Sequence, residues 1–225
     1  MNLKSLVVAL AAAVCLPAMS ATVYSNDFEA NAAGISGAGS LQGTQGYSGL
    51  GYGMQFLRNA ALGNPQPASV LSLNLAGAAT GAMLSLDLGI IDSWDGAGNF
   101  GPDFFNVKVD GVTVFSQNFN NFAGATVHPA LATKAYGAVL GFNSTFADSA
   151  YLLTLALGNL SAGAHSIEFF ASGANWQGGS DESWGIDNVL VTANFANPIP
   201  EPETYALMLA GLGVVAAVAR RRRSR

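Results

Sequence analysis

Between residues 22 and 197 the sequence contains no long stretch in which apolar residues recur every three or four positions, the spacing of an amphipathic helix. Instead, short segments alternate apolar and polar residues, which is typical of strands with one buried face. Gly, Asn and Ser fill the gaps, and Asp110-Gly111 is a tight hairpin signal. The pattern predicts an all-β antiparallel sandwich of eight or nine short strands, with strands over 22–28, 69–75, 82–90, 104–109, 112–115, 150–157, 165–171 and 186–195.

The first twenty residues have the pattern of a secretory signal peptide. Lys4 is followed by an apolar segment, residues 6–16, and then by Pro17 and small residues that predict cleavage before Ala21. Eleven apolar residues are too few to span a bilayer, which argues against a retained anchor. The single cysteine, Cys15, lies inside this peptide, so the mature domain is expected to have no disulfide. A hydrophobic core or bound ions must stabilise it instead.

The charge is unevenly distributed along the chain. Residues 22–199 hold three basic and twelve acidic residues, a net charge of −9, although the whole chain has a formal charge of −5. A domain without a basic stripe is not expected to bind nucleic acid. The acidic balance favours divalent cations or neutral sugars as ligands, although an acidic surface also serves solubility alone.

The C-terminus combines three features in a fixed order. Pro200, Glu201 and Pro202 are followed by the uncharged segment 204–219 and by a basic end with Arg220, Arg221, Arg222 and Arg223. As a helix, sixteen residues reach ~24 Å, short of the ~30 Å hydrocarbon core, so the segment suits a transient halt in the membrane better than a permanent anchor. The arginines are expected to stay cytoplasmic, which leaves the domain outside. An unprocessed tail anchor is the alternative.

This arrangement resembles the PEP-CTERM sorting signal. The resemblance implies a Gram-negative bacterium with an exopolysaccharide system, and processing by exosortase, an integral-membrane transpeptidase. The expected organisation is a signal peptide (1–20), a sandwich domain (21–195), a linker with the motif (196–203), a hydrophobic helix (204–219) and a basic tail (220–225). Exosortase, exopolysaccharide and envelope components are therefore the expected partners, with transient insertion into the inner membrane and a final location at the cell surface or outside the cell.

The central domain resembles the jelly-roll modules of bacterial surface proteins and the MAM and reelin-type sandwich. The segments "NDFE" (26–29), "IDSWDGAGNFGPDFFNVKVDGVTVF" (91–115) and "DESWGIDNVLV" (181–191) carry this resemblance. It implies that the first and last strands lie side by side. It also implies a structural calcium ion near the paired termini.

Two groups of acidic residues are candidate calcium ligands, because calcium prefers six to eight oxygen atoms. The loop "DSWDGAGNFGPD" offers Asp92, Asp95 and Asp103, with an Asp- and Gly-rich turn as the alternative. The paired termini would bring Asp27 and Glu29 close to Asp187 and Asn188, with solvent-facing acids as the alternative. Asp181 and Glu182 are able to join either group.

Trp176 and Trp184 lie in a Gly- and Asp-rich segment, and packing in the core is the favoured interpretation, with a platform for stacking on sugar rings as the alternative. Catalysis has little support. The two histidines, His128 and His165, form no zinc or triad motif, and an acid pair such as Asp92 with Glu182 is the only hint of glycoside hydrolysis.

Together, these features predict a non-catalytic exported protein of the cell surface or extracellular matrix, associated with exopolysaccharide or biofilm and stabilised by calcium. The alternatives are a carbohydrate-binding module and, less favoured by the residues, a polysaccharide-active enzyme.

Overall fold

The computed structural model describes residues 19–96, 100–195, 208–213 and 220. The chain divides into two units, Ser20–Phe195 and a terminal unit made of Met1–Met19 and Ala196–Arg225. In the terminal unit, residues 208–213 are helical. Among the described residues, none belongs to a helix with the length and apolar character that a membrane crossing requires. Most of the predicted signal peptide, the Pro-Glu-Pro motif and Arg221 to Arg223 lie outside the described residues.

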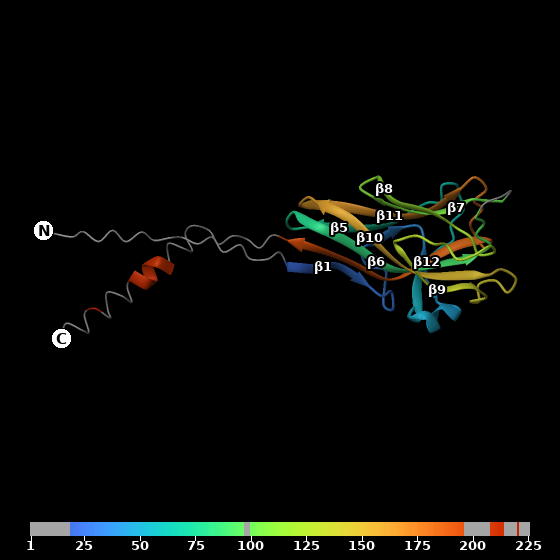
Figure 1. Cartoon of the computed structure of the whole chain (residues 1–225), viewed down its shortest axis with the longest axis horizontal. Helices are drawn as coiled ribbons and strands as arrows, with labels where there is room; N and C mark the ends of the chain where they lie inside the picture. Colours follow the sequence, from blue (N-terminus) through green and yellow to red (C-terminus); the bar gives the residue numbers. More distant parts are fainter. Residues whose placement is uncertain (1–18, 97–99, 196–207, 214–219, 221–225) are drawn as a thin grey trace. The chain divides into compact units, whose positions relative to one another are not determined.

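The unit Ser20–Phe195 consists of two antiparallel sheets that pack face to face. In Figure 1, β8, β11 and β7 belong to one layer, and β1, β12 and β9 belong to the other. The seven-stranded sheet has the order β3 (Ser40–Gly43), β4 (Gln55–Asn59), β12 (Glu182–Phe195), β6 (Ala79–Asp92), β10 (Asp148–Leu160) and β9 (Leu131–Ala138), and β1 (Met19–Asn26) also pairs with β12. The five-stranded sheet has the order β2 (Ile35–Gly37), β5 (Ser69–Leu75), β11 (Gly163–Gly173), β7 (Asp103–Val109) and β8 (Val112–Phe119).

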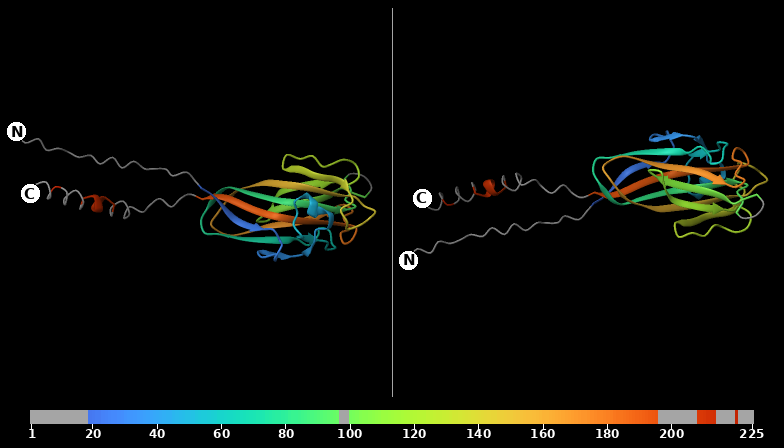
Figure 2. Two further views of the ribbon diagram at one scale, coloured as in Figure 1. Left: turned by 90° about the horizontal axis from the view of Figure 1, so that it is seen from below. Right: turned by 90° about the horizontal axis from the view of Figure 1, so that it is seen from above.

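The main core lies between the two sheets and follows from the alternation of side chains along each strand. In β10, for example, Leu153 and Leu155 are buried, whereas Leu152 and Thr154 face outward. A second, smaller core lies at the helical turn η1 (Gln45–Leu50), which Figure 2 shows outside the seven-stranded sheet. It contains Tyr47, Tyr52, Phe56, Ile91 and Ala150. Both faces of the centre of the seven-stranded sheet are therefore covered.

The predicted fold class, an antiparallel β-sandwich of jelly-roll type, is confirmed, and β1 pairs with β12 as the resemblance implied. Strand β5 has the predicted bounds, but β6, β10 and β12 are longer than predicted. The sequence reading missed β2, β3, β4 and β9. These strands are short or lie at sheet edges, and β9 is half exposed, so their sequences carry little of the apolar alternation that marks a buried strand.

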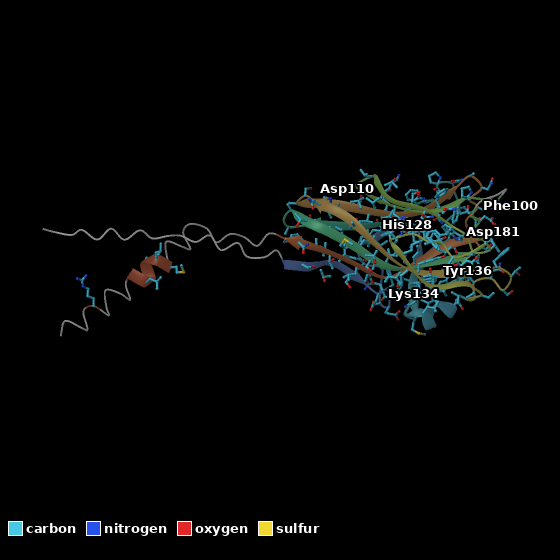
Figure 3. The ribbon with its side chains drawn as sticks, in the orientation of Figure 1. Phe100, Asp110, His128, Lys134, Tyr136 and Asp181 are labelled. Atoms are coloured by element: carbon cyan, nitrogen blue, oxygen red, sulfur yellow. The ribbon has the colours of Figure 1, made fainter. Side chains whose placement is uncertain are left out.

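The predicted hairpin joins β7 to β8. Asp110 (φ 49°) and Gly111 (φ 80°) both adopt the left-handed conformation that the tightest hairpin turns require, between the paired residues Val109 and Val112. The Asp110 carboxylate accepts hydrogen bonds from the backbone N–H of Ser166 at 2.9 Å and from His165 Nδ1 at 2.7 Å. These contacts tie the turn to β11. Figure 3 labels Asp110 toward one end of the sandwich, whereas Asp181 lies toward the other.

His165 is held between two acceptors. Its Nδ1 faces Asp110, and its Nε2 lies 2.9 Å from the carbonyl oxygen of Ser161. A neutral imidazole has only one N–H, so donation to both acceptors requires the protonated ring. The hydrogen bond to Asp110, followed by the one to Ser161, raises the pKa of His165. Both contacts therefore favour the protonated form of His165, which links the hairpin turn to β11.

We expect His165→Gln to reduce stability in a pH-dependent way. Because the folded-state pKa of His165 is raised, its stabilising effect is fully present below the unfolded pKa of about 6.5 and is lost as the pH rises through the folded pKa. The difference in melting temperature between wild type and His165→Gln should thus be larger at about pH 5.5 than at about pH 9. His128→Gln is the matched control. An equal difference at both pH values would contradict the assignment.

Candidate metal centre

The loop between β6 and β7 is closed at its neck by two hydrogen bonds between acidic residues. The Asp95 N–H donates to Asp103 Oδ2 at 2.6 Å, and the Asp103 N–H donates to the Asp95 carbonyl at 2.8 Å. Gly101 passes so close to this neck that a Cβ atom there would lie 2.4 Å from the Asp95 carbonyl oxygen. Glycine is therefore required at this position, and the two carboxylates are fixed next to each other.

Glu182 joins these two residues from the other sheet. Asp103 is the first residue of β7 in the five-stranded sheet, and Glu182 is the first residue of β12 in the seven-stranded sheet. Ligand atoms of Asp95, Asp103 and Glu182 all lie within 4.8 Å of one another, and no other trio of potential ligands in the described part of the chain meets this condition. We call these three residues the acidic triad.

The acidic triad has two carboxylate oxygens that lack a partner. Asp103 and Glu182 are fully buried. Glu182 Oε2 accepts the N–H groups of Gln177, at 2.8 Å, and of Gly178, but Glu182 Oε1 and Asp103 Oδ1 have no hydrogen-bond partner. A buried oxygen of this kind loses its hydration without compensation. The arrangement therefore calls for a proton or a cation.

The raised pKa values of the three triad residues also indicate that the site favours a proton or a cation. Burial raises the pKa of Glu182 and of Asp103, and nearby acidic residues, including Asp181, raise both values further. Burial and the charge of Asp181 also raise the pKa of Asp95. No basic side chain contributes to any of these shifts. Three clustered carboxylates, two of which have an unpaired oxygen, are a set that a hard cation such as calcium prefers, with carbonyl groups or water completing its shell.

Asp92, which the sequence placed in the same group, occupies a different environment. It is buried beside Asp148 and Arg58, and its backbone N–H donates to Asp148 Oδ1 at 2.9 Å. Burial and the charge of Asp148 raise the pKa of Asp92 to about 7, against the opposing effect of Arg58. Glu182 takes its place in the triad, as the sequence allowed. The structure thus brings together two of the three predicted loop residues.

The predicted group at the paired termini does not converge in the same way. Asp27 is exposed and accepts the N–H of Glu29. Glu29 Oε1 accepts the N–H groups of Met54, at 2.6 Å, and of Gln55, at 3.0 Å. Asp187 Oδ2 accepts the N–H group of Gly53 at 2.9 Å. These two carboxylates therefore hold the segment that follows η1 against the sheet. Asp87, which is opposite Asp187 in the register of β6 and β12, has a side-chain cation as its partner, because Lys134 Nζ lies 2.5 Å from Asp87 Oδ1.

Both tryptophans of the alternative glycan platform, Trp176 and Trp184, are packed in the core. Trp184 is fully buried, stacks edge-on against Phe105 at 5.1 Å and donates to Gln66 Oε1 at 2.6 Å. Trp176 is 5% exposed and packs against the ring of Trp94 at 4.9 Å. A domain without disulfides gains stability from burying such large rings, so neither face is available to a sugar.

Comparisons of the whole structure find carbohydrate-binding modules among its similar structures, with low similarity. A family 35 carbohydrate-binding module from an environmental isolate is 18% identical (TM-score 0.41), and the alignment covers 78% of this chain and 99% of that one. A family 35 module from Cellvibrio japonicus is 14% identical (TM-score 0.39; 77% and 92% covered). A xylan-binding family 22 module from Paenibacillus barcinonensis is 10% identical (TM-score 0.40; 81% and 100% covered).

No curated protein matches the sequence. The C-terminal segment does match a family model. Residues 198–223 match the PEP-CTERM protein-sorting motif, and this motif contains the Pro200-Glu201-Pro202 sequence and the arginines from Arg220 to Arg223. The chain therefore carries a PEP-CTERM sorting motif, which implies export, sorting to the cell envelope and exosortase as the processing partner.

Proposed function

We propose that this chain is a non-catalytic, exported component of the cell surface or extracellular matrix, and that calcium stabilises its β-sandwich. The acidic triad carries the proposal. It joins residues of both sheets, two of its three residues are fully buried, and two of its carboxylate oxygens lack any partner. An ion held there links β7 to β12 directly, so the triad has a structural role.

The energetic argument follows from linkage. Without an ion, the folded state must either bring charged carboxylates together or bind protons that the unfolded chain does not bind at neutral pH. An ion that binds only the folded state removes this cost, and it adds about 2.7 kcal/mol to the free energy of unfolding at about 100 times its dissociation constant. For an exported domain without cysteine, this contribution replaces part of what disulfides supply in other secreted proteins.

We expect chelation to lower the melting temperature of the exported protein and added calcium to restore it. Glu182→Gln removes one ligand charge, so this variant should lose the response to calcium. Its ion-free form should melt at or above the ion-free wild type at about pH 8, because one buried like charge is gone. Differential scanning calorimetry with and without calcium measures both effects.

Glu168→Gln is the matched control for this experiment, since it makes the same chemical change on β11, away from the triad residues. It should keep the full response to calcium. Identical melting curves of the wild type with chelator and with calcium would overturn the proposed role of calcium.

The location and association belong to the same proposal. A net charge of −9 between residues 22 and 199 suits a matrix in which divalent cations bridge acidic groups. Fractionation of the native cells should find the protein with the envelope or the exopolysaccharide, and deletion of residues 198–223 should move it out of that fraction. Recovery of the full-length protein in the cytoplasmic fraction would contradict this part of the proposal.

Carbohydrate binding is a second candidate, and one observation favours it. A recess of about 290 Å³ beside the acidic loop is lined by neutral polar groups that include Gln117, Asn118, Asn120 and Thr126. Amide and hydroxyl groups of this kind suit the hydroxyl groups of a neutral sugar. Selective binding on a glycan array that Asn118→Ala abolishes would establish this function. An array without selective binding would favour the structural role.

A further inference from the structure

We propose that Lys134 and Asp87 are joined by an isopeptide bond, an amide between Lys134 Nζ and Asp87 Cγ. Lys134 lies on the edge strand β9 and Asp87 on β6, with β10 between them in the sheet. The Lys134 side chain spans β10 and places its Nζ 2.5 Å from Asp87 Oδ1.

The pair is shielded from water on the side of Asp87, whereas the Lys134 side chain keeps 25% of its surface exposed. Asp87 is 5% exposed, and the ring of the buried Tyr52 lies 5.2 Å from Lys134 Nζ. The carbonyl oxygen of Leu50, at the end of η1, accepts a hydrogen bond from the same Nζ at 3.1 Å. Figure 3 shows Lys134 close to this helical turn. The ring of Tyr52 and the carbonyl of Leu50 therefore hold the Lys134 amino group in one geometry beside Asp87.

Asn188 prepares the carboxyl group for attack. Its Nδ2 donates to Asp87 Oδ2 at 2.9 Å and is held in place by a second hydrogen bond, at 3.0 Å, to the carbonyl of Gly51. The N–H group therefore points at the oxygen on which negative charge develops when Cγ is attacked. A fixed donor at this position stabilises the tetrahedral intermediate.

The reaction balances without an oxidant or a co-reactant. The ammonium group of Lys134 and the carboxylate of Asp87 condense to an amide and one water molecule. One ammonium proton first passes to Asp87 Oδ1, which frees the lone pair of Nζ and neutralises the carboxyl group. Nζ then forms a bond to Cγ, the bond from Cγ to Oδ1 breaks, and Oδ1 leaves as water with a second proton from Nζ. One positive and one negative charge disappear together. The close approach of Nζ and the carboxyl group supplies the effective concentration that such a condensation needs.

The bond would have a clear structural effect. Strand β9 forms the edge of its sheet and is paired with β10 alone. An amide to β6 ties this edge strand across its neighbour to the centre of the sheet, so β9 cannot separate from β10 without covalent strain. The mature domain has no cysteine to form a disulfide, and this bond would take that place. The inference does not depend on calcium or on the proposed function.

Mass spectrometry of the purified, folded, full-length chain tests the proposal. The denatured wild type should have the mass of its sequence, after any terminal processing is mapped, less one water molecule. Tandem spectra of a protease digest should identify a branched peptide that links Lys134 to Asp87. Lys134→Arg, which keeps the positive charge, and Asp87→Ala should both show the full mass and no branched peptide.

Lys108→Arg is the matched control. Lys108 lies over the ring of Phe170, at 5.0 Å, on the other sheet, so this variant should still lack one water molecule. Circular dichroism shows that each variant is folded before its mass is measured. Full mass and two separate linear peptides in the folded wild type would overturn the proposal, and would mean that the pair remains an ion pair.

Discussion

The position of β12 at the centre of the seven-stranded sheet determines most of what this domain is able to do. β12 pairs with β6 along most of its length and also contacts β4 and β1. Its residues serve three purposes in sequence order. Glu182 enters the acidic triad, Trp184 fills the main core, and Asp187 with Asn188 holds the segment after η1. If β12 were displaced, the triad, the core and the covering segment would all lose a contact.

The two buried groups of acids meet the same electrostatic problem in different ways. A buried carboxylate needs a partner, because desolvation costs more than neighbouring dipoles alone return. At Asp87 the chain supplies its own partners, Lys134 Nζ and the side-chain amide of Asn188. In the acidic triad no basic side chain takes part, and two oxygens stay unpaired. The first group is therefore complete within the chain, whereas the second calls for a bound ion or protons.

A prediction of the strands from the sequence succeeds where apolar and polar residues alternate regularly along the chain. Strand β5, with its regular apolar and polar residues, has the bounds that the pattern indicates, and the Asp110-Gly111 turn specifies its hairpin locally. It fails at β9, whose residues are half exposed and include Lys134, because an edge strand buries too little surface to impose a pattern. The tryptophans show the same limit. Trp176 lies in a polar segment, yet its ring packs in the core.

The sequence alone determined the strand-rich class, the hairpin, the absence of cysteine from residues 20–195 and the C-terminal sorting motif, because each depends on residues close together in the chain. The tertiary structure decided which acids meet. Asp103 and Glu182 come from different sheets, and Asp92 turns toward Asp148 and Arg58. Lys134 reaches Asp87 across an intervening strand. Such encounters depend on strand order and register, which are set by long-range pairing and packing that no local pattern encodes.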